Sequence, residues 1–184
     1  MDRELVELAQ GGDMDAFDAL VRLTGDRCLG IAYRILRDVG LAEDAVQAAY
    51  LSAWRELRSL RDPDRFEGWL HRTLARACYE EARRTRRFAA NVRALPVETS
   101  YAPDDVLTVV DRDQLERGIR RLSIEQRTVL VFHHYLGLSL VEIADRLDLP
   151  VGTVKSRLHY GATALRAALD ADARATVPSE ERLA

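Results

Sequence analysis

Hydrophobic residues recur along most of this chain at intervals of three and four, the spacing that lines one face of an α-helix. The pattern predicts a short first helix ending at the glycines of residues 11–12, where Asp13 can cap the next helix. Further helices are expected over about residues 14–37, with Gly25 as a weak point, and over 41–60, 66–87, 107–122 and 124–136. Because few glycines and prolines interrupt these runs, the expected fold class is all-α.

The most informative stretch is residues 138–169. Ser139 and Glu142 have the spacing of a capping box, which begins a helix, and Pro150 ends that helix by disfavouring helical geometry at the residue before it. A second helix can start at once, with Gly152 allowing another backbone to come close. Its expected buried face consists of Val154, Leu158, Ala162 and Leu165. Two helices joined by so short a turn form a helix-turn-helix pattern.

The outward face of this second helix has the chemistry of a DNA reader. Residues 151–169 contain three cations and no carboxylate, so the segment can approach phosphates, although an ordinary hairpin with a solvated basic face would show the same charge. Uncharged hydroxyls between the cations favour insertion into the major groove. The candidate upstream DNA-binding residues are Thr153, Lys155, Ser156, Arg157, His159 and Tyr160.

Residues 138–144 and 150–158 resemble the promoter-reading domain of extracytoplasmic-function sigma factors, the smallest members of the sigma-70 family. The resemblance implies that the outward face of the second helix reads the upstream (−35) promoter element. Residues 122–132 also resemble the entry to that domain.

A second resemblance to the same family occurs earlier in the chain. Glu43, Asp44 and Gln47 cluster at the start of a helix, followed by the aromatics Tyr50 and Trp54. Acids in a first helical turn often only complement the helix dipole. The resemblance implies instead that Glu43, Asp44, Gln47 and Tyr50 contact core RNA polymerase.

An arginine-rich helix lies between these two motifs. Residues 65–93 hold eight arginines against three glutamates, and cations beside aromatic rings suit single-stranded DNA, although a solvated basic face is the plainer interpretation. The run at residues 66–72 and the following 80–84 resemble the family's helix for the melted downstream element. The candidate downstream residues are Arg61, Arg65, Trp69, Arg72, Arg76, Tyr79, Arg83 and Arg84.

Five positions depart from the family's usual residues. Ala48 replaces a common acid, which predicts a weaker or shifted grip on polymerase, and Arg76 and Glu80 replace asparagine and aspartate in the downstream reader. Tyr160 and Ala162 stand where arginines are usual, which predicts weaker and altered recognition of the upstream element.

The expected organisation is two small helical domains joined by an acidic linker. Residues 1–90 would bind polymerase and the downstream element, 91–113 would be the linker, 114–170 the helix-turn-helix domain and 171–184 a disordered tail. Residues 94–113 carry a net charge of −4, in keeping with an extended linker.

Composition argues against several other classes of protein. Cys28 and Cys78 are far apart with no second cysteine nearby, and the adjacent pair His133 and His134 has no ligand spacing, so no metal, cofactor or catalytic residue is expected. No signal-like leader or bilayer-length apolar run is present, which predicts a cytoplasmic protein without membrane insertion.

We therefore expect a sigma factor, not an enzyme, with core RNA polymerase and promoter DNA as partners, both as upstream duplex and as downstream single strand. An anti-sigma factor is a further partner by family habit, although no residue demands one. The alternatives are a conventional helix-turn-helix regulator that acts without being a polymerase subunit, a cysteine or histidine hydrolase, and a helical adaptor.

Overall fold

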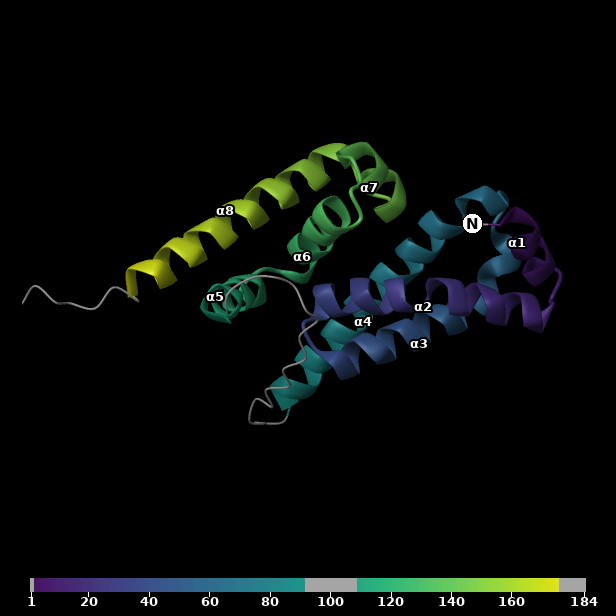
Figure 1. The fold of residues 1–184 in the computed structure, drawn as a ribbon, viewed down its shortest axis with the longest axis horizontal. Helices are drawn as coiled ribbons and strands as arrows, with labels where there is room; N and C mark the ends of the chain where they lie inside the picture. Colours follow the sequence, from purple (N-terminus) through teal and green to yellow (C-terminus); the bar gives the residue numbers. More distant parts are fainter. Residues whose placement is uncertain (1, 92–108, 176–184) are drawn as a thin grey trace, which may run out of the picture.

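The computed structural model describes residues 2–91 and 109–175, and all regular elements in those ranges are helices, as the hydrophobic pattern predicts (Figure 1). In chain order they are α1 (Arg3–Gln10), α2 (Met14–Leu36), α3 (Val39–Glu56), the 3-10 turns η1 (Leu57–Ser59) and η2 (Pro63–Arg65), α4 (Phe66–Asn91), α5 (Val109–Arg120), α6 (Ile124–Leu130), the π-helical turn η3 (Val131–Tyr135), α7 (Leu140–Leu147) and α8 (Val151–Ala175).

Helices α1 to α4 form the first domain. Helix α3 presents a row of small buried residues, so α2 and α4 pack closely on its two sides. The row consists of Ala42, Ala45, Ala49 and Ala53. At the end of the domain near α1, Phe17 and Trp54 meet edge to face with ring centroids 5.0 Å apart.

The ends of these helices follow local sequence rules. The Asp13 carboxylate accepts a hydrogen bond from the Ala16 amide at 3.0 Å, which confirms the expected cap of α2. Asp38 caps α3 in the same way. Helix α2 continues through Gly25 without a break, because buried residues on both sides of it, Thr24 and Cys28, hold the helix in the core. The expected weak point at Gly25 is therefore wrong.

Helices α5 to α8 form the second domain, and α7 and α8 are the predicted helix-turn-helix. The capping box is present, with Ser139 Oγ accepting from the Glu142 amide and a Glu142 carboxylate oxygen accepting from the Ser139 amide at 2.8 Å. Helix α7 ends at Asp148, which takes a left-handed conformation at φ 57°. Phe132, Ile143 and Val154 form the centre of this domain's core.

Two expectations for α8 are wrong. Its buried face contains Gly161, whose added Cβ would lie 3.2 Å from Leu130 Cδ1, whereas Ala162 is exposed. The reason is that the helix meets α6 at close range, so the smallest residue takes the inner position. Gly152 has no atoms within 4 Å of an added Cβ, so it mediates no close backbone approach among the described residues.

Several element boundaries also differ from the expectation. The polar loop at residues 58–65 contains two 3-10 turns, and the helix expected over 124–136 widens into a π turn at Val131 before Gly137 ends it at φ 69°. Helix α5 begins at Val109, inside the expected linker, and α8 reaches Ala175, inside the expected tail, because its last residues are mostly alanine. The expected linker residues 92–108 and tail residues 176–184 lie outside the described residues.

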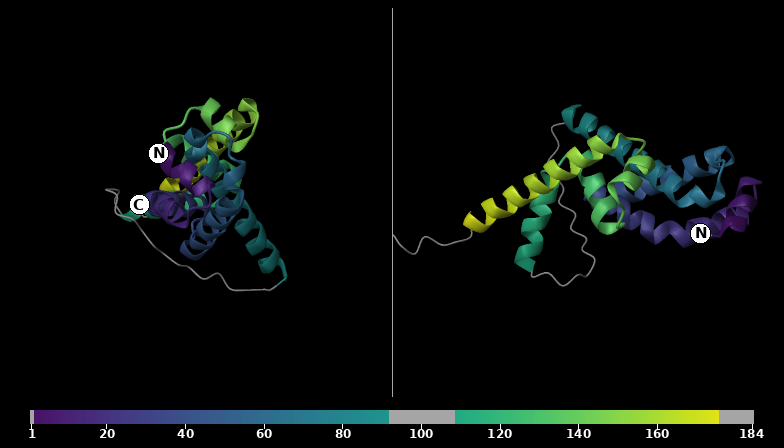
Figure 2. Two further views of the ribbon diagram at one scale, coloured as in Figure 1. Left: turned by 90° about the vertical axis from the view of Figure 1, so that its right-hand side faces the viewer. Right: turned by 90° about the horizontal axis from the view of Figure 1, so that it is seen from above.

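The two domains pack against each other. Helices α6, η3 and α7 contact α2 and α4, and Glu116 of α5 pairs with Arg37 at the end of α2. The far end of α8 extends away from the first domain, as the right-hand view of Figure 2 shows. Among residues 2–91 and 109–175, no helix is long and apolar enough to cross a lipid bilayer.

Candidate nucleic-acid interface

Helix α8 presents the predicted upstream-element residues on its outer surface. Lys155, Ser156, His159 and Tyr160 are exposed, because Val154 and the glycine at 161 turn the opposite face into the core. Ser156 Oγ donates to the Thr153 carbonyl at 3.0 Å, which fixes the side chain along the helix.

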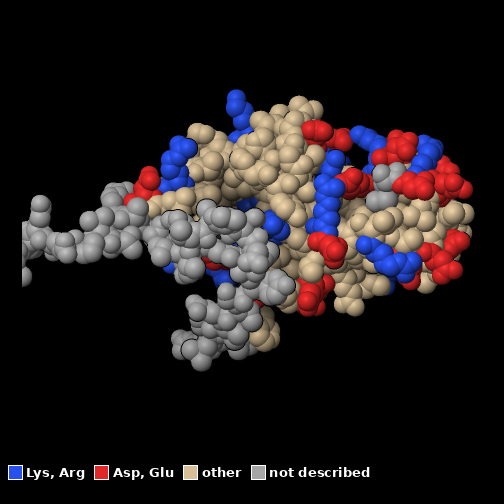
Figure 3. All heavy atoms as spheres, in the orientation of Figure 1, with Lys and Arg blue, Asp and Glu red and all other residues tan. Residues whose placement is uncertain are grey.

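The aromatic end of this surface is available for contact. The rings of His159 and Tyr160 lie 5.5 Å apart, and Tyr160 is 63% exposed. Arg157 and Thr153 lie at the edge of the same surface and are partly buried. The face therefore offers cations, hydroxyls and aromatic edges together, which suits a groove of duplex DNA. In Figure 3, basic side chains stand out singly along α8, whereas acidic and basic groups alternate over the end of the molecule that carries α1.

The arginines of the second half of α4 are exposed but partly neutralised within the helix. Arg83 pairs with Glu80 at 2.7 Å, and Arg84 pairs with Glu81 at 2.8 Å. The pair of Arg83 with Glu80 is exposed and contributes little to stability, so Arg83 can exchange its partner for a phosphate at small cost. Glu81 is instead buried, so Arg84 also serves to neutralise a buried carboxylate. Arg76 on α4 and Arg61 in the turn before it are exposed as well.

Arg65 at the end of η2 and Arg72 of α4 are different, because they contact the second domain. The Arg65 guanidinium lies 2.9 Å from the Asp145 carboxylate. Arg72 donates from Nε to the Arg146 carbonyl at 2.8 Å and from a terminal nitrogen to the Asp145 carbonyl. Trp69 is partly buried next to Phe66. Two predicted DNA-binding arginines thus bind the end of α7.

Tyr79 lies at the contact between α4 and α6. It is half-buried, and burial raises the pKa of its hydroxyl, against a smaller lowering contribution from Thr128. In this arrangement Tyr79 therefore packs against the second domain.

The predicted polymerase contacts divide into two sets. Glu43, Asp44 and Gln47 are exposed and close together on the first turns of α3. Tyr50 is instead partly buried, with its hydroxyl 2.8 Å from Thr24 Oγ1, and desolvation raises its pKa. Thr24 Oγ1 already donates to the Leu20 carbonyl, so Tyr50 is the donor to Thr24.

His71 has a role in the domain contact that the sequence does not indicate. It is almost completely buried, its Nδ1 lies 2.8 Å from a guanidinium nitrogen of Arg146, and its ring meets Phe132 at a centroid distance of 6.0 Å. A histidine inside an arginine-rich motif gave no sign of this role, because its partners lie more than sixty residues away in sequence.

The groups that could support an enzyme are unsuited to catalysis. Cys28 and Cys78 are buried, and burial raises the pKa of Cys78 to about 12 and that of Cys28 as well, which keeps both thiols protonated. His133 Nδ1 lies 2.8 Å from the Leu138 carbonyl, an interaction within the π turn. Within the described ranges, no group of three or more His, Cys, Asp or Glu side chains could hold a metal ion.

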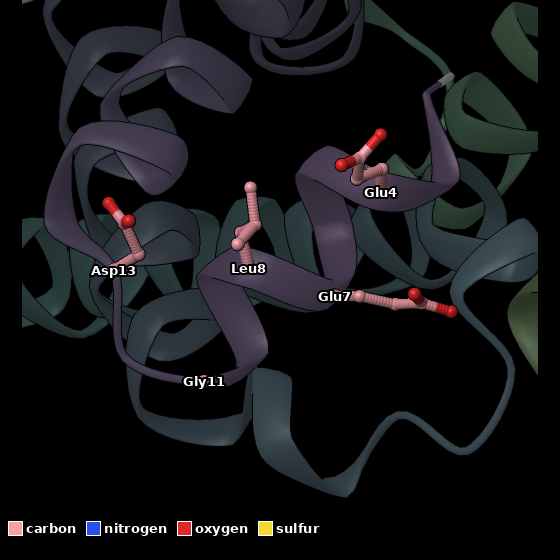
Figure 4. Close-up of a pocket in the computed structure, with 5 residues that line it drawn as sticks. All are labelled: Glu4, Glu7, Leu8, Gly11 and Asp13. Atoms are coloured by element: carbon pink, nitrogen blue, oxygen red, sulfur yellow. The ribbon is translucent and has the colours of Figure 1, made fainter.

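A surface hollow of about 410 Å³ lies beside α1 and is lined by Glu4, Glu7, Leu8, Gly11 and Asp13 (Figure 4). In Figure 4 the side chains of Glu4, Leu8 and Asp13 project to one side, whereas Glu7 points away from them. The hollow offers carboxylates alone and is open to solvent, so it has no pairing of nucleophile and base.

Comparison with protein families matches two separate parts of the chain. Residues 20–88 match the family model described as Sigma-70 region 2, and residues 112–165 match the one described as Sigma-70, region 4. The first range contains α3 and most of α4, and the second contains the helix-turn-helix.

Curated relatives match over most of their length. The ECF RNA polymerase sigma factor SigW of Bacillus subtilis is 30% identical over 178 residues, which cover 90% of this chain and 95% of that protein. The RNA polymerase sigma-H factor of Pseudomonas aeruginosa is 33% identical over 181 residues, which cover 91% of this chain and 93% of that protein.

Solved structures agree with this comparison. CnrH, solved in complex with the cytosolic domain of CnrY, has a TM-score of 0.65 and 28% identity, with 93% of this chain and 98% of that chain covered. The sigma factor RpoE of Bartonella quintana, solved with the anti-sigma factor NepR, has a TM-score of 0.69 and 22% identity, with 85% of this chain and 98% of that chain covered. At that identity the similarity concerns the fold alone.

Proposed function

This chain belongs to the extracytoplasmic-function sigma factors of the sigma-70 family, the promoter-specificity subunits of RNA polymerase, and we propose which of its residues perform each step of initiation. The observation that carries the proposal is that both family matches fall, in order, on the two domains that present exposed polar surfaces at α3 and α8. The family is one of transcription factors without catalytic activity, so we assign no active site. Because its work is done on RNA polymerase, the cytoplasm is the proposed location.

Core polymerase is proposed to bind at Glu43, Asp44 and Gln47. Their exposure on adjoining turns of α3 supports this role, because all three side chains can reach one partner surface. Tyr50 is proposed to support the surface from beneath through the packing of its ring, while its hydroxyl bonds Thr24.

Upstream promoter DNA is proposed to bind the outer face of α8, where Lys155, Ser156, His159 and Tyr160 reach base edges, with Thr153 and Arg157 nearest the phosphates. The absence of carboxylates from residues 151–169 supports this role, since an anionic groove meets no like charge there.

Downstream DNA is proposed to bind α4 and the turn before it as a single strand. The basic surface favours unpaired over paired DNA through phosphate contacts and stacking on exposed bases, and this difference in binding free energy makes strand separation less costly. The proposed residues are Arg61, Arg65, Trp69, Arg72, Arg76, Tyr79, Arg83 and Arg84.

A run-off transcription assay from a library of random promoter sequences, with core polymerase and with or without the protein, tests these assignments. We expect transcripts that need the protein and share an upstream and a downstream motif. Asp44→Ala combined with Gln47→Ala should reduce binding to core, whereas Glu56→Ala, an exposed change on the same helix, should not.

For the upstream element, Lys155→Ala should reduce transcription from selected promoters, and Arg166→Ala, an exposed change further along α8, serves as the control.

Tight duplex binding by the chain alone, without core binding or transcripts, would favour a conventional helix-turn-helix regulator. Family membership does not favour that alternative, because the match at residues 20–88 lies outside the helix-turn-helix. An anti-sigma factor is a further proposed partner, which co-purification from the native host would identify.

A further inference from the structure

Helix α6 packs against α2 and α4, and three arginines lie together at this contact (Figure 1). The Arg37 guanidinium at the end of α2 binds both oxygens of the Glu116 carboxylate, and Arg120 donates from Nε to the same carboxylate at 2.9 Å. Arg127 of α6 lies beside them, because its Nη1 donates to the Leu36 carbonyl at 3.4 Å. One carboxylate thus serves two guanidinium groups, and a third is held next to them.

Arg127 has few partners for a cation that is partly buried. Its Nε is buried without a hydrogen-bond partner, its other terminal nitrogen makes no hydrogen bond, and it pairs with no carboxylate among residues 2–91 and 109–175. Burial, followed by the charges of Arg37, Arg86 and Arg120, lowers its pKa to about 10, against an opposing contribution from Glu125. The side chain therefore keeps unused donors in a positive field.

Arg86 of α4 supplies a fourth guanidinium group. It is exposed and forms no ion pair within the described ranges, although its charge acts on Arg127. Across the cluster, four arginines face the two carboxylates of Glu116 and Glu125, which leaves a net charge of +2. An anion with two negative charges balances this excess.

The arrangement suits one compact anion better than an extended strand. The Arg37 side chain is only 15% exposed and is fixed between Glu116 and the ring of Tyr33, whose centroid lies 5.0 Å from the guanidinium carbon. Arg120 is 51% exposed, so its terminal nitrogens remain accessible. Guanidinium groups that gather at one place match the several oxygens of a single phosphate group, whereas a nucleic acid presents its phosphates in a row.

We propose that Arg86, Arg120 and Arg127 bind a small phosphate-bearing anion, while Arg37 and Glu116 hold the cluster in place. The guanidinium groups donate charge-assisted hydrogen bonds to the oxygens of the anion, and its charge reduces the repulsion among the arginines. Because these arginines come from both domains, the bound anion stabilises the contact of α2 and α4 with α5 and α6.

Isothermal titration calorimetry of the full chain with pyrophosphate tests the site, with sodium chloride at the same ionic strength as the control for screening. We expect saturable binding of pyrophosphate at one site. Arg86→Gln should weaken this binding about tenfold, the effect of losing one charge-assisted hydrogen bond. Arg87→Gln is the matched control, because it removes the same charge from an exposed neighbour that lies about 100° around α4.

Thermal unfolding provides a second measurement. Pyrophosphate should raise the unfolding temperature of the wild type and of Arg87→Gln, should raise that of Arg86→Gln by less, and should leave that of Arg127→Met unchanged. Arg86→Gln alters an exposed side chain without an ion pair among the described residues, so it decides the question even if Arg127→Met does not fold.

No binding of pyrophosphate by the wild type, or equal binding by Arg86→Gln and Arg87→Gln, would overturn the site. A fluorescein-labelled single strand of about 20 nucleotides separates this site from the DNA surface. If Arg86→Gln weakened binding of this oligonucleotide more than binding of pyrophosphate, the arginines would belong to the DNA surface and the proposal would be wrong. These measurements need no polymerase, so their outcome is independent of the proposed function.

Discussion

A guanidinium nitrogen of Arg146, on the first helix of the helix-turn-helix, lies 2.8 Å from Nδ1 of His71 in the other domain. Since arginine can only donate, His71 accepts at Nδ1 and its neutral ring carries the proton on Nε2. The Glu67 carboxylate lies 4.0 Å from that nitrogen, and Arg27 of α2 adds a further positive charge nearby. The buried contact therefore depends on a neutral histidine.

We predict that acid weakens the fold through His71. Burial, followed by the charge of Arg146, lowers its pKa to about 4 from 6.5. Between these values the unfolded chain binds the proton more tightly, so the stabilisation is present above about pH 6.5 and is lost as the pH falls towards 4. The loss should approach about 3 kcal/mol.

Urea denaturation at pH 7 and at about pH 5 measures this effect. His71→Gln keeps an acceptor for Arg146 but cannot titrate, so its stability should fall less over the same interval. An identical fall in the wild type and in His71→Gln would show that other groups carry the pH dependence.

The hydrogen bond between Tyr50 and Thr24 gives a second prediction. Tyr50→Phe keeps the ring but removes the donor, so the free energy of unfolding should fall by about 1 kcal/mol. Binding to core polymerase should change little, because the hydroxyl faces Thr24. Chemical denaturation and a core-binding titration measure the two effects. A large loss of core binding with unchanged stability would instead make Tyr50 a direct contact.

The core of the helix-turn-helix gives a third prediction. Ile143 of α7 is fully buried, so Ile143→Ala should leave a cavity and cost about 2–5 kcal/mol. Val141, two residues earlier, is 65% exposed, and Val141→Ala should change the free energy of unfolding by less than about 0.5 kcal/mol. Thermal unfolding of both variants measures the difference, and similar effects would mean that α7 packs differently.

Two glycines give a fourth prediction. Neither Gly152 nor Gly137 has an atom within 4 Å of an added Cβ, but Gly137 has φ +69° whereas Gly152 lies in the first turn of α8. Gly152→Ala should therefore stabilise the protein by about 0.4–1 kcal/mol, and Gly137→Ala should destabilise it by more than that. Urea denaturation compares them directly. Changes of the same sign would show that backbone conformation does not decide the effect.

Helix positions and caps could be predicted from the sequence because they depend on neighbouring residues. Asp13, Ser139 and Glu142 each bind an amide within three residues, so their roles need no knowledge of the rest of the fold. The π turn at Val131 could not be predicted, since α and π turns share the same apolar spacing over a single turn.

The candidate site was predictable only in part. The exposure expected for Lys155 and Tyr160 follows from helical spacing alone, and the structure agrees with it. The inner position of Gly161 depends on how closely α8 approaches α6, which no periodicity contains. Tyr50 is similar, because its aromatic spacing on α3 does not tell whether the hydroxyl meets solvent or Thr24.

By itself, the sequence determined the all-α class, the helix-turn-helix and the family, because these rest on local spacing and on two motifs in order. The packing of the two domains decides which arginines contact the other domain. Arg65 and Arg72 look like Arg76 in sequence, yet they bind oxygens of Asp145, which lies 80 residues from Arg65 and 73 from Arg72. Contacts of that kind depend on how two packed domains meet, and each domain's own residue pattern leaves that meeting undetermined.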